Sequence, residues 1–138
     1  MDTLSITFDP AIRPDGQHAL RSDYVETFWL PKVGPSAICF LRAMGNSYAP
    51  IEHLCQAPTI EMPFAEVSAA MGLTRRKPSK NHRLLRMLSR LEWAQLLQRD
   101  NELNIRLAPY LPTLHANQIA TLPVSIQALH TIELTNLK

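Results

Sequence analysis

The stretch from Ser79 to Leu91 has the spacing of a two-faced helix, and this feature constrains the fold of the chain most. Leu84, Leu88 and Leu91 recur at i, i+4 and i+7, which places them along one side of an α-helix. At about 100° per residue, four cations fall on the opposite side: Lys80, Arg83, Arg86 and Arg90. The leucine side must be buried, so we expect the core to form around this helix.

The neighbouring segments predict a second helix before this one and a β-hairpin after it. Residues 63–71 have helical spacing, and Gly72 follows as a helix stop. A short extended segment, residues 59–62, leads into that helix. The hairpin is predicted from a strand, a turn and a strand with alternating apolar residues, which are residues 94–98, 99–101 and 103–107.

Outside this region the pattern predicts peripheral residues and extra helices. Residues 1–21 are expected to be peripheral, because Pro10 and Pro14 interrupt a possible short strand in which Leu4, Ile6 and Phe8 alternate with polar residues. Helices are then expected from Ser22 or Asp23 to Pro31, from Pro35 to a C-cap at Gly45-Asn46, over residues 113–120, and from Pro123 onward.

The order of elements from Ile60 to Leu107 resembles the winged helix-turn-helix superfamily of DNA-binding domains. This stretch reads "IEMPFAEVSAAMGLTRRKPSKNHRLLRMLSRLEWAQLLQRDNELNIRL" and covers about a third of the chain. The resemblance implies an α+β, mostly α, fold: a winged helix-turn-helix with additional N- and C-terminal helices. Residues 22–138 would then form a single domain, with a helix-turn-helix core at about 60–107 and C-terminal helices at about 113–135. With the aromatic segment "FWLPKVGP" ahead of this stretch, the whole chain also resembles small actinobacterial winged-helix proteins of unknown role.

The distribution of charge independently favours a polyanionic partner. Seven of the fourteen Lys and Arg residues lie between positions 75 and 90, and no Asp or Glu occurs between Glu66 and Glu92. The rest of the chain carries seven cations and twelve acids. A concentrated cationic window on an otherwise acidic protein is typical of a protein that binds a phosphate backbone.

The resemblance also implies a role for each residue of the cationic window. Residues 79–91 would be the recognition helix in the major groove, with Asn81 and Arg83 reading base edges and His82 contacting either bases or phosphates. Phosphate contacts are expected from Arg75, Arg76, Lys77, Lys80, Arg86 and Arg90. The turn of residues 74–78 is longer than the usual turn of this family. Acidic residues at the hairpin tip offer phosphates little, so the wing is expected to have only a structural role. The implied function is a cytoplasmic, nucleoid-associated DNA-binding protein, either a transcriptional regulator or a nucleoid factor.

Two other interpretations of the cationic helix remain open. It could be a solvated surface, or it could belong to a winged-helix module that binds an acidic protein partner without DNA. An enzyme is not expected and no cofactor is implied, because GxxxxGK and GxGxxG are both missing from the sequence. The sequence also lacks a Cys-x-x-Cys pair, so no metal site is predicted. No stretch approaches the roughly 20 apolar residues that span a bilayer.

Apolar residues near both ends leave the oligomeric state open. They are Tyr24, Val25, Phe28 and Trp29 near the start, and Val124, Ile126, Leu129 and Ile132 near the end. These residues either complete the core of the monomer or form a two-fold homodimer interface, in which Trp29 would be the expected anchor.

Overall fold

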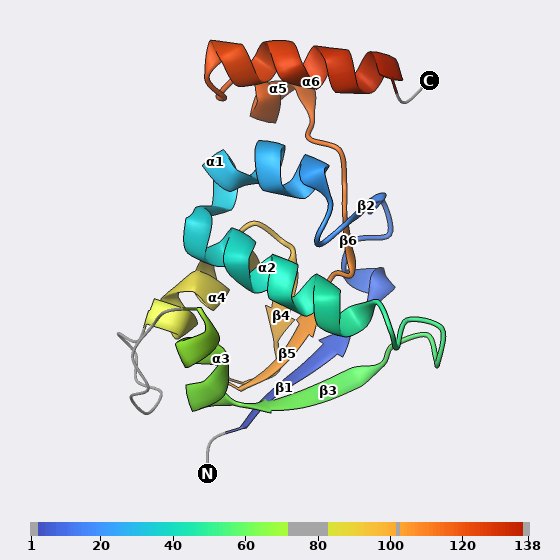
Figure 1. The fold of residues 1–138 in the computed structure, drawn as a ribbon, viewed down its shortest axis with the longest axis vertical. Helices are drawn as coiled ribbons and strands as arrows, with labels where there is room; N and C mark the ends of the chain where they lie inside the picture. The colour runs from blue at the N-terminus through green and yellow to red at the C-terminus, as the bar shows by residue number, and fades with distance from the viewer. Residues whose placement is uncertain (1–2, 72–82, 102, 137–138) are drawn as a thin grey trace.

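The main sheet is built around a strand from the very start of the chain. The computed structural model describes residues 3–71, 83–101 and 103–136. The fold is α+β, and its four-stranded mixed sheet has the order β3-β1-β5-β4. Strand β1 (Thr3–Phe8) pairs antiparallel with β3 (Thr59–Pro63) and parallel with β5 (Asn104–Leu107). Figure 1 shows this sheet at one end of the molecule and the C-terminal helices at the other.

The expectation that residues 1–21 are peripheral is therefore wrong. The side chains of Leu4, Ile6 and Phe8 are completely buried. Alternation does predict a strand there, but its central position depends on two partners more than fifty residues away along the chain. Beyond a short 3-10 helix η1 (Pro10–Ile12), this segment also contributes β2 (His18–Ala19), which pairs with β6 (Tyr110–Leu111).

The first helical region continues past Pro31, where the sequence predicted its end. A five-residue π-helical turn, η2 (Val25–Trp29), leads directly into α1 (Leu30–Val33). Pro31 directly follows the π-helical turn, at the start of α1, so the helical stretch passes through this proline instead of ending at it. The chain breaks instead at Gly34, whose φ of 88° lies in the left-handed region that glycine adopts readily.

Helix α2 (Pro35–Tyr48) begins where the sequence predicted but ends later. The expected C-cap, Gly45, lies inside the helix rather than at its end. A Cβ atom at Gly45 would lie 3.0 Å from the backbone nitrogen of Arg21. The glycine therefore permits the close approach of two chain segments, and it does not mark a boundary.

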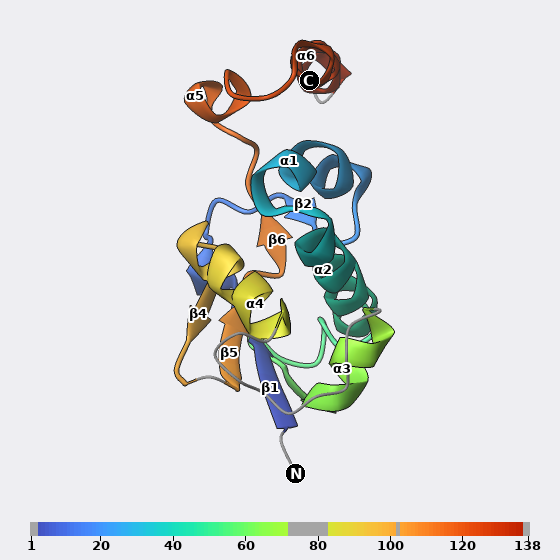
Figure 2. The ribbon, with the colours of Figure 1, turned by 90° about the vertical axis from the view of Figure 1, so that its left-hand side faces the viewer.

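Helix α3 (Phe64–Ala70) lies within the first helical segment predicted at the centre of the chain, and α4 (Arg83–Trp93) overlaps the second but ends two residues after its predicted end at Leu91. The part of the second prediction that covers residues 79–82 lies outside the described residues. In α4 the side chains of Leu84, Leu88 and Leu91 are completely buried, which confirms its predicted inner side. Figure 2 shows α4 in front of the sheet, with α2 beside it.

A β-hairpin follows α4, as the sequence predicted, but its first strand starts later. Gln95 has a φ of 64°, and the N–H groups of Gln95 and Leu96 donate to the carbonyls of Glu92 and Leu91. This pair of bonds closes the helix in the pattern of a Schellman cap. Strand β4 (Leu97–Arg99) begins only after it and pairs antiparallel with β5.

The C-terminal segment forms two further helices, as expected, α5 (Ala116–Ile119) and α6 (Val124–Asn136). The aromatic residues near the start of the chain are buried in the monomer, with Phe28 and Trp29 both nearly inaccessible. The indole N–H of Trp29 donates to the carbonyl of Pro112 over 3.1 Å. Trp29 is therefore a core residue, and its side chain does not reach the surface where an interface anchor would have to lie.

Candidate nucleic-acid interface

Helix α4 presents a basic side to solvent, opposite its buried leucines. Arg83 and Arg86 are both exposed, whereas Leu84 and Leu88 between and after them are completely buried. Because a helical turn is 3.6 residues, Arg83, Arg86 and Arg90 follow one another along a single strip of the surface. We call these three residues the arginine strip.

The arginine strip borders a hollow of about 270 Å³ between α4 and the start of α2. Its lining residues are Ser36, Arg83, Arg86, Met87 and Arg90. The N-terminus of α2, where Gly34 provides no side-chain cap, adds a partial positive charge on the same side. None of these lining residues is acidic. Guanidinium groups are positively charged and donate several hydrogen bonds, so the hollow suits an anionic group such as a phosphate.

Arg90 differs from the other two arginines of the strip because the fold already engages it. Its Nη1 donates to the carbonyl oxygen of Val33 over 3.2 Å. The same nitrogen would lie 2.6 Å from a Cβ atom placed on Gly34, so the guanidinium packs directly over that glycine. The sequence predicted a phosphate contact for Arg90, and the structure adds that this side chain joins α4 to the α1–α2 junction.

By contrast, Arg83 and Arg86 have no acidic partner within the described part of the chain. The other residues predicted for this surface lie outside the described residues, so only three of the nine can be placed. Those outside are Arg75, Arg76, Lys77, Lys80, Asn81 and His82.

The arginines of the hairpin are paired within the protein. Arg99 lies 3.1 Å from the Glu92 carboxylate and donates to the Ser89 hydroxyl over 2.7 Å, which ties β4 to α4. Arg106 lies 3.6 Å from the Asp100 carboxylate, and a second acid, Asp9, is 3.9 Å away. This arrangement agrees with the expectation that the hairpin is structural.

Trp93 is a surface feature that sequence reasoning missed. Its side chain is 88% exposed, which is unusual for so large an apolar group. It follows Arg86 by seven residues, two helical turns, so it lies on the same side of α4 as the arginine strip. The i+7 spacing from Arg86 to Trp93 is visible in the sequence and could have indicated this position.

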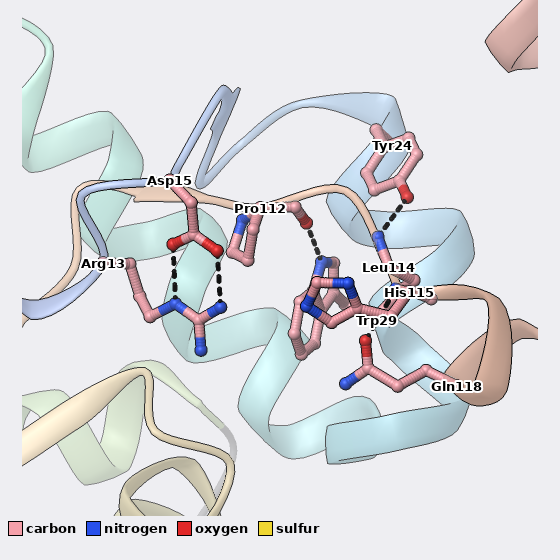
Figure 3. A network of polar contacts seen from close by, with 8 residues as sticks. All are labelled: Arg13, Asp15, Tyr24, Trp29, Pro112, Leu114, His115 and Gln118. Atoms are coloured by element: carbon pink, nitrogen blue, oxygen red, sulfur yellow. Dashed lines mark hydrogen bonds and ion pairs between the residues drawn. The ribbon is translucent and has the colours of Figure 1, made fainter.

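A buried polar cluster joins the C-terminal segment to the N-terminal half (Figure 3). The hydroxyl of Tyr24 accepts a hydrogen bond from the N–H of Leu114 over 2.9 Å and shares one of 2.6 Å with Nε2 of His130. The ring of His18 stacks on that of Tyr24, with the centroids 3.7 Å apart. These two histidines therefore stabilise the tertiary structure. Among the described residues, no three His, Cys, Asp or Glu side chains gather closely enough to hold a metal ion.

Two further polar pairs perturb pKa values at a distance from the arginine strip. A hydrogen bond from the Arg13 guanidinium, also shown in Figure 3, lowers the pKa of Asp15. The hydroxyl of Tyr110 donates to Glu52 over 2.5 Å, and this bond, with some burial, raises the pKa of Tyr110 to about 12. Neither pair borders the hollow beside α4, so neither adds to the candidate interface.

Comparisons with protein-family models, with curated proteins and with solved structures find no match to this chain. The candidate interface is therefore defined by its own geometry and charge. Across residues 3–71, 83–101 and 103–136, no helix combines the length and apolar character needed to cross a bilayer.

Proposed function

We propose that this protein binds duplex DNA through α4, as a winged helix-turn-helix protein. The order α2, β3, α3, α4, β4, β5 supports the proposal, because it places a strand, two helices and a hairpin in the succession that the family resemblance implies. In this proposal α4 enters the major groove, which is wide enough to admit an α-helix.

The observation that carries the proposal is the contrast between the arginines of α4 and those of the hairpin. Arg99 and Arg106 have carboxylate partners close by. Arg83 and Arg86 are exposed and, among the described residues, without such partners. Two exposed cations on one helix, for which residues 3–71, 83–101 and 103–136 supply no carboxylate partner, are available to contact phosphates and base edges.

Each residue of the surface has a proposed role. Arg83 and Asn81 read bases, His82 contacts bases or phosphates, and Arg86 contacts the backbone. Arg90 adds its charge while holding α4 to the α1–α2 junction. The remaining cations are proposed to contact phosphates: Arg75, Arg76, Lys77 and Lys80. Such a protein would act in the cytoplasm, at the nucleoid, as a transcriptional regulator or a nucleoid-associated factor.

The test is a fluorescence-anisotropy titration of labelled duplex DNA at two salt concentrations. We expect binding that weakens steeply as salt rises, because each phosphate contact releases counterions. The double variant Arg83→Glu/Arg86→Glu should abolish binding. Its control is Arg21→Glu/Arg42→Glu, which makes the same change in net charge on exposed arginines that do not line the hollow. Equal loss in both variants would contradict a specific role for α4.

The exposed indole of Trp93 favours one alternative, a module that binds an acidic protein. Trp and Arg are the residue types most enriched at the energetic centres of protein interfaces, and here Trp93 shares a helix side with Arg86. In that case the protein would ignore duplex DNA and form a saturable complex with an acidic polypeptide. Trp93→Ala would then weaken that complex at least as strongly as Arg86→Ala.

A further inference from the structure

A hollow of about 310 Å³ between α2, β3 and α3 collects more than half of the sulfur-bearing side chains of the chain. The sequence has two cysteines and five methionines. Four of these seven side chains line this one hollow: Cys39, Met44, Met62 and Met71. They come from three different elements, so only the fold brings them together. The arginine strip borders a different hollow, so this place is separate from the candidate nucleic-acid interface.

The position of each sulfur atom follows from the element that carries it. Cys39 and Met44 belong to α2, Met62 to β3 and Met71 to the C-cap of α3, which lies beside α2 in both ribbon views (Figures 1 and 2). Met44 is 2% exposed and forms part of the floor, whereas Cys39 is exposed and lies at the mouth. Ala43 lines the hollow about one helical turn after Cys39, and its short side chain leaves room beside the thiol. The four side chains therefore surround one space that opens to solvent at Cys39.

Packing alone does not account for this hollow. Methionine has the flexible apolar side chain that normally fills irregular gaps in a core. Here three methionines border a space that none of them closes, although other parts of its wall, such as Phe40 and Val67, are apolar as well. The space is therefore suited to a ligand that sulfur atoms can hold.

The donor atoms select the class of ligand. Thiolate and thioether sulfur atoms are soft ligands that favour Cu(I), whereas Mg²⁺ and Ca²⁺ take oxygen ligands. Among the described residues, the lining contains one carboxylate, Glu66, and no histidine, so zinc and the harder cations lack their usual ligand sets there. The Cys-x-x-Cys pair that the sequence lacks is a pattern of zinc sites, and its absence does not bear on methionine ligands.

We propose that this hollow binds one Cu(I) ion through the thiolate of Cys39 and the thioethers of its three methionines. On binding, the thiol of Cys39 releases its proton to water and its sulfur bonds to the ion, and no electron is transferred. A thiolate and a monovalent cation cancel in charge, so the apolar walls enclose no net charge. Because the ligands come from α2, β3 and α3, the bound ion stabilises the packing of these elements. The site does not depend on DNA binding.

The test is an anaerobic titration of the full chain with Cu(I) in competition with a chromophoric Cu(I) chelator. The parent protein should bind one Cu(I) ion per chain. Met62→Leu and Met71→Leu keep an apolar side chain of similar volume, and each should weaken Cu(I) binding by about tenfold or more. Met87→Leu is the matched control, because Met87 is a buried methionine, 5% exposed, that does not line this hollow. It should bind Cu(I) as tightly as the parent.

A second pair of variants tests the thiol and covers the case in which a leucine variant unfolds. Because Cys39 is exposed, Cys39→Ser should keep the fold but lose tight Cu(I) binding, whereas Cys55→Ser changes an exposed cysteine outside the hollow and should retain it. Cu(I) should raise the thermal unfolding midpoint of the parent and of Cys55→Ser, but not that of Cys39→Ser. A parent that binds no Cu(I), or equal Cu(I) affinities for Cys39→Ser and Cys55→Ser, would overturn the proposal. Folded methionine variants that bind Cu(I) as tightly as Met87→Leu would overturn it as well.

Discussion

The guanidinium of Arg90 donates a hydrogen bond to the carbonyl of Val33, 57 positions earlier, and covers Gly34 as it does so. This contact fastens the outer edge of α4 to the point where α1 ends and α2 begins. It also holds the arginine strip beside the uncapped start of α2. One arginine of the strip is thus engaged in the fold, and the other two project from it.

The first prediction separates Arg90 from Arg86 by stability. Arg90→Ala should lower the free energy of unfolding by about 1–2 kcal/mol, because the Val33 carbonyl loses a charged donor. Arg86→Ala should change it by less than about 0.5 kcal/mol, as expected for an exposed side chain. Urea denaturation of the two variants measures the difference. Equal stability would mean that the Arg90 contact contributes nothing.

The second prediction separates Arg83 from Arg86 by specificity. If Arg83 reads a guanine, Arg83→Ala should reduce the discrimination between target and random duplex by about 1–3 kcal/mol. Arg86→Ala should weaken both complexes alike and reduce the slope of affinity against salt by about one unit. Competition titrations with the two duplexes give both quantities. If Arg83→Ala also weakens binding to the target and the random duplex by the same factor, Arg83 contacts phosphates and does not read a base.

The third prediction concerns the Tyr24 hydroxyl. Tyr24→Phe should destabilise the protein by about 1–3 kcal/mol, because the Leu114 N–H and His130 lose the oxygen that they share in a buried site. Tyr110→Phe is the control, since it removes a hydroxyl whose partner, Glu52, is exposed. Its effect in thermal unfolding should be clearly smaller. If the two variants lose the same stability, the buried hydroxyl of Tyr24 contributes no more to folding than the hydroxyl of Tyr110.

The fourth prediction is that Tyr110 loses its proton at a higher pH than an ordinary tyrosine does. The hydrogen bond to Glu52 is the largest cause that raises the pKa of Tyr110 to about 12, from an ordinary value of 10.0. A folded-state pKa above the unfolded value stabilises the protein fully below pH 10, and this contribution is lost as pH rises from 10 through 12. Tyrosinate absorbance should show this late step, and Tyr110→Phe should remove it. Glu52→Gln should move the step toward pH 10; a step that stays near 12 would exclude Glu52 as the cause.

Much of the local structure could be predicted from the sequence. Helices α3 and α4, the hairpin of β4 and β5, and the start of α2 at Pro35 all lie where spacing and proline placed them. Each depends on residues within a few positions of one another, through helical or alternating periodicity and through backbone limits at proline.

Contacts between distant segments could not be predicted in the same way. Gly45 has the residue type of a helix stop, yet it lies inside α2, because the backbone at Arg21 passes within 3.0 Å of where its Cβ would be. Trp29 could have belonged to a core or to an interface, and its hydrogen bond to Pro112 places it in the core. Neither outcome can be recognised from the residues that flank Gly45 or Trp29 in the sequence.

The sequence alone thus determined the helices α3 and α4 and the hairpin of β4 and β5, and it placed Arg83, Arg86 and Arg90 on the side of α4 opposite its leucines, because both follow from local periodicity. Only the tertiary structure decided that β1 lies inside the sheet, between β3 and β5, and that Arg90 is engaged by Val33 while Arg83 and Arg86 are exposed. These depend on which distant surfaces pack together to bury apolar area and satisfy polar groups, and that choice is a property of the whole chain.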